Sequence, residues 1–183
     1  MSLKNIKKNK QGVTMMETVV ALGVLILGII TILALMASAI AFSQISEHSI
    51  IVANLAREGI EVVRSIRDFS RTDPSVLPSG ATSFFDSSVD GCYIVDVKNN
   101  FNLHNFIDDQ YWQQIGACSG CQLYQDQTSN LYSHSATGKE TVFKRAIKIE
   151  EVSSHEKKVL SKVTWTERGR THEFILEDHL TDW

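Results

Sequence analysis

The longest apolar run of the chain, residues 13–42, limits most strictly what this sequence can fold into. Its only ionisable side chain is Glu17, and the stretch from Thr18 to Phe42 carries no charge. A helix that rises about 1.5 Å per residue needs roughly 20 apolar residues to cross a hydrocarbon layer about 30 Å thick. The run exceeds this length, whereas helices buried in soluble domains seldom stay uncharged for so long. We therefore predict a transmembrane helix over residues 13–42.

The charges on either side of this run predict its orientation. The preceding segment carries only positive side chains, at Lys4, Lys7, Lys8 and Lys10, whereas the segment after it has mixed charges. Positively charged flanks stay in the cytoplasm. The N-terminus is therefore expected in the cytoplasm and the residues after about 42 outside it. An alternative is a cleaved secretory signal, because Ala37-Ser38-Ala39 has the small residues of a signal-peptidase site.

Glu17 is an unusual residue for a membrane helix. A carboxylate near the centre of a bilayer costs about 2.5–3.5 kcal/mol on insertion scales. Either Glu17 lies at the level of the lipid headgroups, where this cost largely vanishes, or it pairs with a buried cation. The second hypothesis requires a partner that supplies the positive charge.

The residues at the start of the apolar run follow a known pattern. Lys8-Asn9-Lys10-Gln11-Gly12 is followed by Val13-Thr14-Met15-Met16-Glu17, and the apolar helix continues from there. A short basic leader that ends in Gly, with Glu as the fifth residue behind it, resembles the class III signal of type IV prepilins and pseudopilins. The resemblance implies that a membrane-embedded prepilin peptidase cuts between Gly12 and Val13, removing the basic leader 1–12. It also implies methylation of the new amine of Val13, although the usual first residue in this family is Phe.

The same resemblance implies a partner for Glu17, namely the terminal amine of Val13 in a neighbouring subunit. Both ions must lose water to pair, so the pair is expected to set the register of assembly rather than to add much net stability. The implied partners are prepilin peptidase, other pilin subunits with the pilus assembly machinery, and the cytoplasmic membrane before assembly. The implied location is the bacterial inner membrane, as a single-pass protein, and then the extracellular pilus.

Over residues 43–72 the pattern changes to that of an amphipathic helix. Apolar residues recur at helical spacing, at Ile51, Leu55, Val62, Ile66 and Phe69, with Val52, Ala56 and Val63 beside them. Arg57 with Glu61, and Arg64 with Asp68, fit ion pairs on the opposite face. No Pro precedes Pro74, so one long helix is expected, which Gly23, Gly28 or Gly59 could bend. Residues 53–64 are similar to the second half of the long helix in PilV-type minor pilins and in I-type pseudopilins of type II secretion.

The remaining chain divides into an irregular, variable region, 73–140, and a C-terminal antiparallel sheet, 141–183. In the first region only residues 92–97 and 122–124 have strand character. In the second, apolar and charged residues alternate over 143–150 and 158–166, and a turn at 167–170 leads into a third strand over 171–178. These strands are expected to be half-buried, with the amphipathic helix as their cover. The predicted fold class is thus α+β, a long N-terminal helix packed on a C-terminal antiparallel sheet.

Residues with the chemistry of binding or catalysis are sparse. Cys118 and Cys121 form a lone C-x-x-C, with Cys92 left over. An extracytoplasmic compartment and the lack of a second ligand pair favour a disulfide over a metal site. Pairing of Cys118 with Cys121, pairing of Cys92 with either, and no bond all stay open. The remaining assignments are structural: His134, His155 and His172 at the surface, Trp112, Trp165 and Trp183 in packing, and Asp86–Asp90 in a polar turn rather than a calcium loop.

Composition and motifs also exclude several functions. The 18 Lys and Arg residues against 21 Asp and Glu give a net charge of −3, which provides no basic field for nucleic acid. No catalytic or cofactor motif is present, so neither enzyme activity nor a cofactor is expected. The leading expectation is a minor pilin, a structural or assembly subunit of a type IV pilus. The alternatives are a pseudopilin of a type II secretion or DNA-uptake system and a single-pass membrane-anchored extracytoplasmic binding protein.

Overall fold

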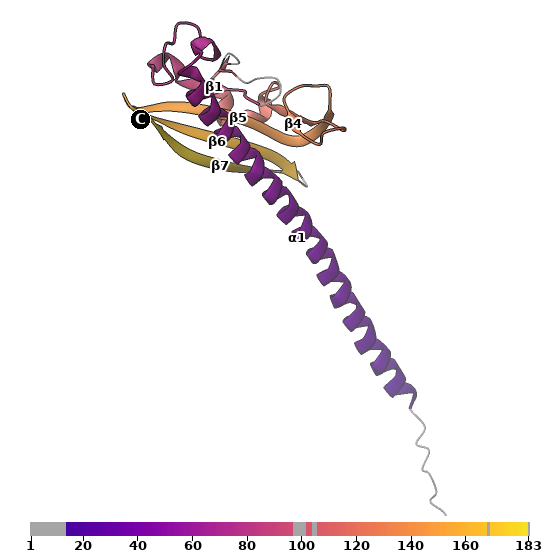
Figure 1. The fold of residues 1–183 in the computed structure, drawn as a ribbon. Coiled ribbons are helices and arrows are strands. Elements are labelled where there is room, and N and C mark those ends of the chain that lie inside the picture. Colours follow the sequence, from indigo (N-terminus) through magenta and orange to yellow (C-terminus); the bar gives the residue numbers. More distant parts are fainter. Residues whose placement is uncertain (1–13, 97–101, 104–105, 168, 183) are drawn as a thin grey trace, which may run out of the picture. The chain divides into compact units, whose positions relative to one another are not determined.

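The structure, a computed structural model, describes residues 14–96, 102–103, 106–167 and 169–182 (Figure 1). The chain divides into two compact units, Met1–Glu47 and His48–Trp183. One helix, α1 (Met15–Ser70), begins in the first unit and ends in the second. The long helix predicted from the sequence is thus confirmed over its described part, and neither Gly23, Gly28 nor Gly59 interrupts it.

The second unit contains an antiparallel sheet built around one long strand, β5 (Lys139–Ser153). On one side β5 pairs with β6 (Glu156–Glu167), which pairs in turn with β7 (Arg170–Thr181). On its other side β5 pairs with β1 (Gly91–Tyr93) near its end and with β3 (Gln122–Gln125) near its start. The short strands β2 (Phe106–Ile107) and β4 (Tyr132–Ser133) pair with β1 and β3. The predicted α+β class is confirmed.

The region expected to be irregular, 73–140, contributes more to the sheet than its sequence indicated. Strands β1 to β4 all come from it, and β5 begins at Lys139, ahead of the predicted boundary at 141. The strand expected over 92–97 is shorter, ending at Tyr93, and residue 97 lies outside the described residues. Short helical segments fill the connections: η1 (Pro74–Val76), η2 (Ser87–Val89), α2 (Gln110–Gln113) and η3 (Ile115–Ala117).

The second half of α1 covers one face of this sheet (Figure 1). The buried helix residues are Val52, Leu55, Ala56, Ile60, Val62, Val63 and Ile66. They meet strand residues such as Ile147, Val159 and Val163 in two apolar clusters. The predicted stripe is therefore largely right, but Phe69 is 46% exposed because it lies in the last turn, where the helix ends.

The helix approaches the sheet closely at Gly59. A Cβ atom added there would lie 2.7 Å from Cδ1 of Ile147 and 2.7 Å from Oγ of Ser161. Beside this contact Arg145 is fully buried, and its guanidinium donates to the backbone carbonyls of Leu55 (3.0 Å) and Val95 (2.9 Å). Gly59 thus allows the helix to reach the sheet rather than bending it.

Part of the other face of the sheet is also covered, over β5 and β6, which corrects the expectation that these two strands are half-buried. Trp112 of α2, Ile115 of η3 and the cysteines form a third apolar cluster with Ala146 of β5. Lys162, expected at the solvent-facing side of its strand, is only 6% exposed. Its Nζ donates to the carbonyl of Trp112 (3.1 Å) and pairs with Glu173 (3.0 Å).

Two arginines of α1, Arg64 and Arg67, and Arg71 directly after the helix are here called the arginine ladder, and they connect this end of the helix to the end of β7. Arg64 contacts Asp178 (2.7 Å), Arg67 donates to the carbonyl of Thr181 (3.3 Å), and Arg71 contacts Asp182 (3.1 Å). Arg64 also pairs with Glu61 (2.6 Å), whereas Asp68 pairs with Arg67 (2.8 Å). The predicted pair of Arg64 with Asp68 is therefore wrong, because the strand offers Arg64 a better-placed carboxylate.

We predict that Gly59→Leu lowers the free energy of unfolding of the second unit by about 1–3 kcal/mol, because the new side chain overpacks the helix–sheet contact. Gly23→Leu is the matched control in the same helix, since nothing lies within 4 Å of the added Cβ there. Thermal unfolding of the full chain in detergent, followed by tryptophan fluorescence, measures both. An unfolding midpoint for Gly59→Leu equal to that of Gly23→Leu would contradict the close approach.

Candidate functional site

The candidate assembly site lies at the start of α1, and the structure describes only part of it. Gly12 and Val13, the predicted processing residues, lie outside the described residues, as do the four lysines of the leader. Glu17 is described: it lies in the first turn of α1, where its backbone N–H donates to the carbonyl of Thr14 (3.0 Å). The positive end of the helix dipole favours a carboxylate at this position.

The surface of the helix after Glu17 is apolar and exposed. Leu22, Leu33 and Phe42 are 58%, 60% and 70% exposed. The few hydroxyl groups turn back onto the helix, as Oγ1 of Thr31 does to the carbonyl of Gly28 (2.8 Å). The helix is long and apolar enough to cross a membrane. Since burying one large apolar side chain contributes about 1.5–3 kcal/mol, covering this surface with lipid or with other chains is strongly favourable.

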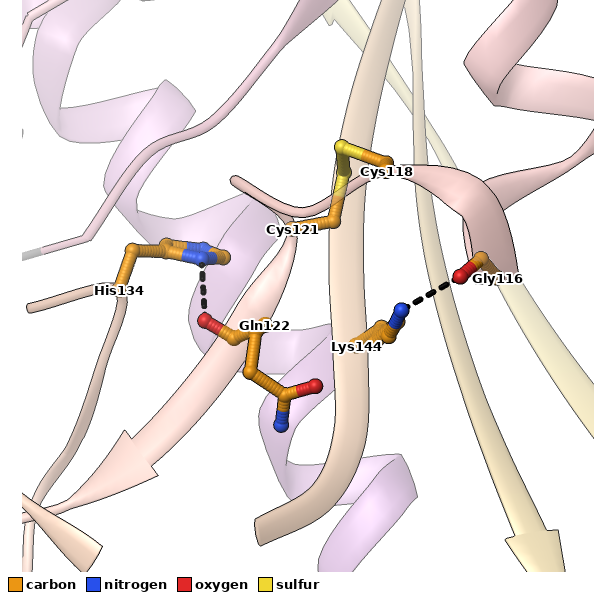
Figure 2. Close-up of a disulfide and its surroundings, with 6 residues drawn as sticks. All are labelled: Gly116, Cys118, Cys121, Gln122, His134 and Lys144. Atoms are coloured by element: carbon orange, nitrogen blue, oxygen red, sulfur yellow. Dashed lines mark hydrogen bonds between the residues drawn. A yellow bond between two sulfur atoms is a disulfide. The ribbon is translucent and has the colours of Figure 1, made fainter. Parts of the chain in front are cut away.

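The three cysteines lie together in the third apolar cluster. Of the pairings that the sequence left open, the structure contains the disulfide between Cys118 and Cys121 (Figure 2). The segment that carries it is held against β5, because the amide of Arg145 donates to the carbonyl of Cys121 (2.9 Å) and Nζ of Lys144 donates to that of Gly116 (2.5 Å). The disulfide thus closes the turn within this segment, and the two hydrogen bonds hold the segment on the second face of the sheet.

Cys92 is a free thiol on β1 and is fully buried. Its Sγ donates to Oδ1 of Asp109 (3.0 Å). Burial, together with this hydrogen bond and the negative charge of Asp109, raises the pKa of the Cys92 thiol to about 12. A thiol with so little thiolate at neutral pH is a poor nucleophile and a poor metal ligand. Among the described residues, no group of three or more His, Cys, Asp or Glu side chains is arranged to hold a metal.

His134 was expected at the surface, but the structure makes it half-buried, with its Nε2 atom fully buried. Figure 2 shows its ring beside Gln122. Its Nδ1 lies 3.2 Å from the carbonyl oxygen of Gln122, and its backbone N–H donates to Oδ2 of Asp96 (3.0 Å). Burial, and then the positive charge of Arg145, lower the pKa of His134 to about 4. His172 is half-buried and stacks on Trp165, whereas His155 is exposed as expected.

Arg145 is the largest fully buried side chain at the helix–sheet interface, and the sequence reasoning missed it. The signal was present, because Arg145 has the same parity along β5 as the inward residues Phe143 and Ile147. A charged residue at an inward position indicates a buried network, here one that includes Glu58, whose Oε1 lies 3.3 Å from the guanidinium.

An open groove of about 480 Å³ lies near the end of β5 and is lined by the carboxylates of Asp90, Asp109, Glu150 and Glu151 with Lys148. All four carboxylates are in ion pairs: Lys148 contacts Glu150 (3.0 Å) and Asp109 (3.9 Å), and the buried Lys157 contacts Asp90 (2.7 Å) and Glu151 (3.6 Å). Asp86, in the turn before this groove, accepts the backbone N–H groups of Thr82 (2.7 Å) and Ser83 (2.9 Å). Its carboxylate therefore shapes the polar turn that the sequence predicted.

We predict that a maleimide reagent at pH 7 does not label the folded chain, because Cys92 is buried and protonated and the other two sulfur atoms are bonded to each other. Unfolding without reductant should expose one thiol, and unfolding with reductant should expose three. Mass spectrometry counts the labels. More than one label without reductant would contradict the disulfide.

We also predict that the chain loses stability on acidification through His134. The unfolded imidazole takes up a proton near pH 6.5, but the folded one does so only near pH 4. The unfolded state therefore binds more protons between these two pH values. The contribution of His134 to the free energy of unfolding is fully present above pH 6.5 and is lost as the pH falls towards 4. It amounts to about 3 kcal/mol over the whole interval. Denaturant unfolding of the wild type and of His134→Gln between pH 7 and 5 measures it, and parallel curves for the two chains would refute the assignment.

No family model, no curated protein and no solved structure matches the chain.

Proposed function

We propose that this chain is a minor pilin, a structural or assembly subunit of a type IV pilus that packs into the filament through the first part of α1. The observation that carries the proposal is an exposed apolar helix with a single carboxylate, Glu17, in its first turn. A helix that only anchors a protein in lipid gains nothing from this carboxylate. A helix that must be positioned against neighbouring helices gains a specific contact from it.

The sequence before Glu17 supplies the cation that the contact needs. Cleavage between Gly12 and Val13 by prepilin peptidase would free an amine on Val13, and this charged amine would donate a hydrogen bond to the Glu17 carboxylate of an adjacent subunit. In apolar surroundings the attraction between the two ions is strong, but the cost of removing water from both offsets much of it. The pair therefore fixes the register between subunits, and the apolar side chains around it supply most of the association energy.

The second unit fits a subunit that functions outside the cytoplasm. Its disulfide between Cys118 and Cys121 forms and persists in oxidising compartments. Its fold fits presentation on the outside of a filament, because the sheet domain has its own apolar core and needs no part of the first unit to complete it. A pseudopilin of a secretion or DNA-uptake system would use the same helix and the same processing residues, and the genes that neighbour this one distinguish the two systems.

We predict that Glu17→Gln and Glu17→Ala leave membrane insertion unchanged but lower incorporation into filaments about tenfold or more, which corresponds to a loss of about 1.4 kcal/mol of pairing per subunit. Glu47→Gln is the matched control, because Glu47 is an exposed acid of the same helix beyond the apolar run. The ratio of subunit in sheared filaments to subunit in membranes, measured by quantitative immunoblot, gives the effect.

Equal incorporation of the Glu17 variants and the wild type would contradict the proposal and favour a simple membrane anchor. If both Glu17 and Glu47 variants failed to enter filaments, the specific role of Glu17 would likewise be refuted.

A further inference from the structure

The outer edge of β7 is the longest free strand edge among the described residues. β7 pairs with β6 over its whole length, Arg170 to Thr181, with no shift of register. No strand of the described residues pairs with its other side. Natural proteins usually protect such an edge with Pro, Lys or a bulge. β7 contains neither Pro nor Lys, and its pairing has no bulge.

The arginine ladder covers only the second part of this edge. Its contacts reach Asp178, Thr181 and Asp182. In the first part of the strand two neighbouring apolar residues, Phe174 and Ile175, are 36% and 44% exposed. The accessible section of the edge is therefore centred on residues 173–177.

A groove of about 410 Å³ runs beside this section, between α1 and β7. Ile60 of the helix and Leu176 of the strand supply its apolar surface, and Arg57, Glu61 and Glu177 are among the charged residues that line it. The groove has room for a few side chains of an added strand. A whole helix would need more space, because its axis would have to lie about 8–10 Å from the axis of α1 along its length.

The two faces of β7 specify what an added strand must carry. On the helix side, Phe174 and Leu176 lie opposite Val163 and Ser161 of β6, both buried against α1. An added strand would continue this apolar layer over the groove. On the other side, Glu173, Ile175 and Glu177 alternate with them. Glu173 contacts Lys162 (3.0 Å) and Glu177 contacts His179 (3.2 Å), but both carboxylates are more than half exposed and can accept a further cation. The complementary strand therefore has basic, apolar and basic residues on that side, because opposite charges directly across a strand pair are stabilising and like charges are destabilising.

A second copy of the chain does not meet these requirements. Parallel pairing of the two β7 strands in register would place Glu173 of one copy beside Glu173 of the other. The two Glu177 residues would meet in the same way, and both contacts are repulsive. Antiparallel pairing of two copies centred on Ile175 would place Glu173 of each copy beside Glu177 of the other, which is again repulsive. That the occupant belongs to another subunit of the same assembly rests on the proposed function.

We propose that β7 binds an extended segment of a different subunit, which adds to the sheet as an antiparallel strand. The segment places apolar side chains over Phe174, Leu176 and the groove, and Lys or Arg side chains opposite Glu173 and Glu177. Main-chain hydrogen bonds to the free edge provide affinity, and the charges provide specificity, as in other cases of strand addition.

The test uses the full chain in an uncharged detergent and two synthetic peptides as long as β7. Both have a central apolar stretch, Val-Ile-Val, flanked by Lys in one peptide and by Glu in the other. Fluorescence anisotropy measures binding, and hydrogen–deuterium exchange locates it. The Lys peptide should slow amide exchange in residues 170–181 and bind about tenfold more tightly than the Glu peptide, since two cross-strand pairs change from repulsive to attractive.

Two variants test the location of binding. Glu177→Lys should lower the affinity for the Lys peptide about three- to tenfold. Glu140→Lys, an equal change of charge at an exposed residue of β5, should leave its affinity unchanged. Equal binding of both peptides, equal effects of the two variants, or protection outside β7 would overturn the proposal. Protection of β7 that rises with protein concentration in the absence of peptide would also overturn it, because a second copy would then occupy the edge. Each of these results is independent of filament entry by the Glu17 variants, so this proposal and the proposed function can fail separately.

Discussion

The structure depends first on the apolar surface of α1 between Glu17 and Phe42, which the described chain leaves exposed. Water is a poor solvent for so much apolar area, so burial of this surface in lipid or against other apolar protein surface is strongly favoured. The only carboxylate of this surface, Glu17, lies at its start and so distinguishes one end of the surface from the other. If both environments serve in turn, the same helix can hold the chain in a membrane and later hold it in a filament, without any change in its own hydrogen bonds.

The second unit, in contrast, buries its apolar side chains in a core of its own. The stripe of α1 that continues beyond His48 covers one face of the sheet, and Gly59 brings the helix close enough for Arg145 to bond its backbone. The segment with α2, η3 and the disulfide covers part of the other face, over β5 and β6. Buried cations at both faces, Arg145 and Lys162, contact carbonyl and carboxylate oxygens of packed elements, although Nε of Arg145 has no hydrogen-bond partner among the described residues. Over β5 and β6 the sheet is therefore the middle one of three layers, whereas Ile175 of β7 is 44% exposed.

Periodicity predicted the elements whose pattern repeats over many residues and missed those that depend on distant contacts. α1 and the three long strands, β5 to β7, have enough repeats to be read from the sequence. Strands β2 and β4 have two residues each, too few for an alternation to be distinguished from chance, and β1, predicted over 92–97, ends at Tyr93. The position of His134 depends on hydrogen bonds with Asp96 and Gln122, which no local pattern connects to it. At the candidate assembly site, Glu17 could be selected because a charge in an apolar run is costly whatever surrounds it, whereas its partner requires a second molecule.

The intact mass of the subunit tests the central claim most directly. The chain should be purified from membranes and from sheared filaments, in cells with and without an active prepilin peptidase. With the peptidase, filament material should have the mass of a chain that begins at Val13, with a methyl group on its new amine and two hydrogens fewer for the disulfide. Without it, the membrane chain should retain residues 1–12 and no subunit should reach filaments. A filament subunit that still begins at Met1, or the same mass in both strains, would contradict the account.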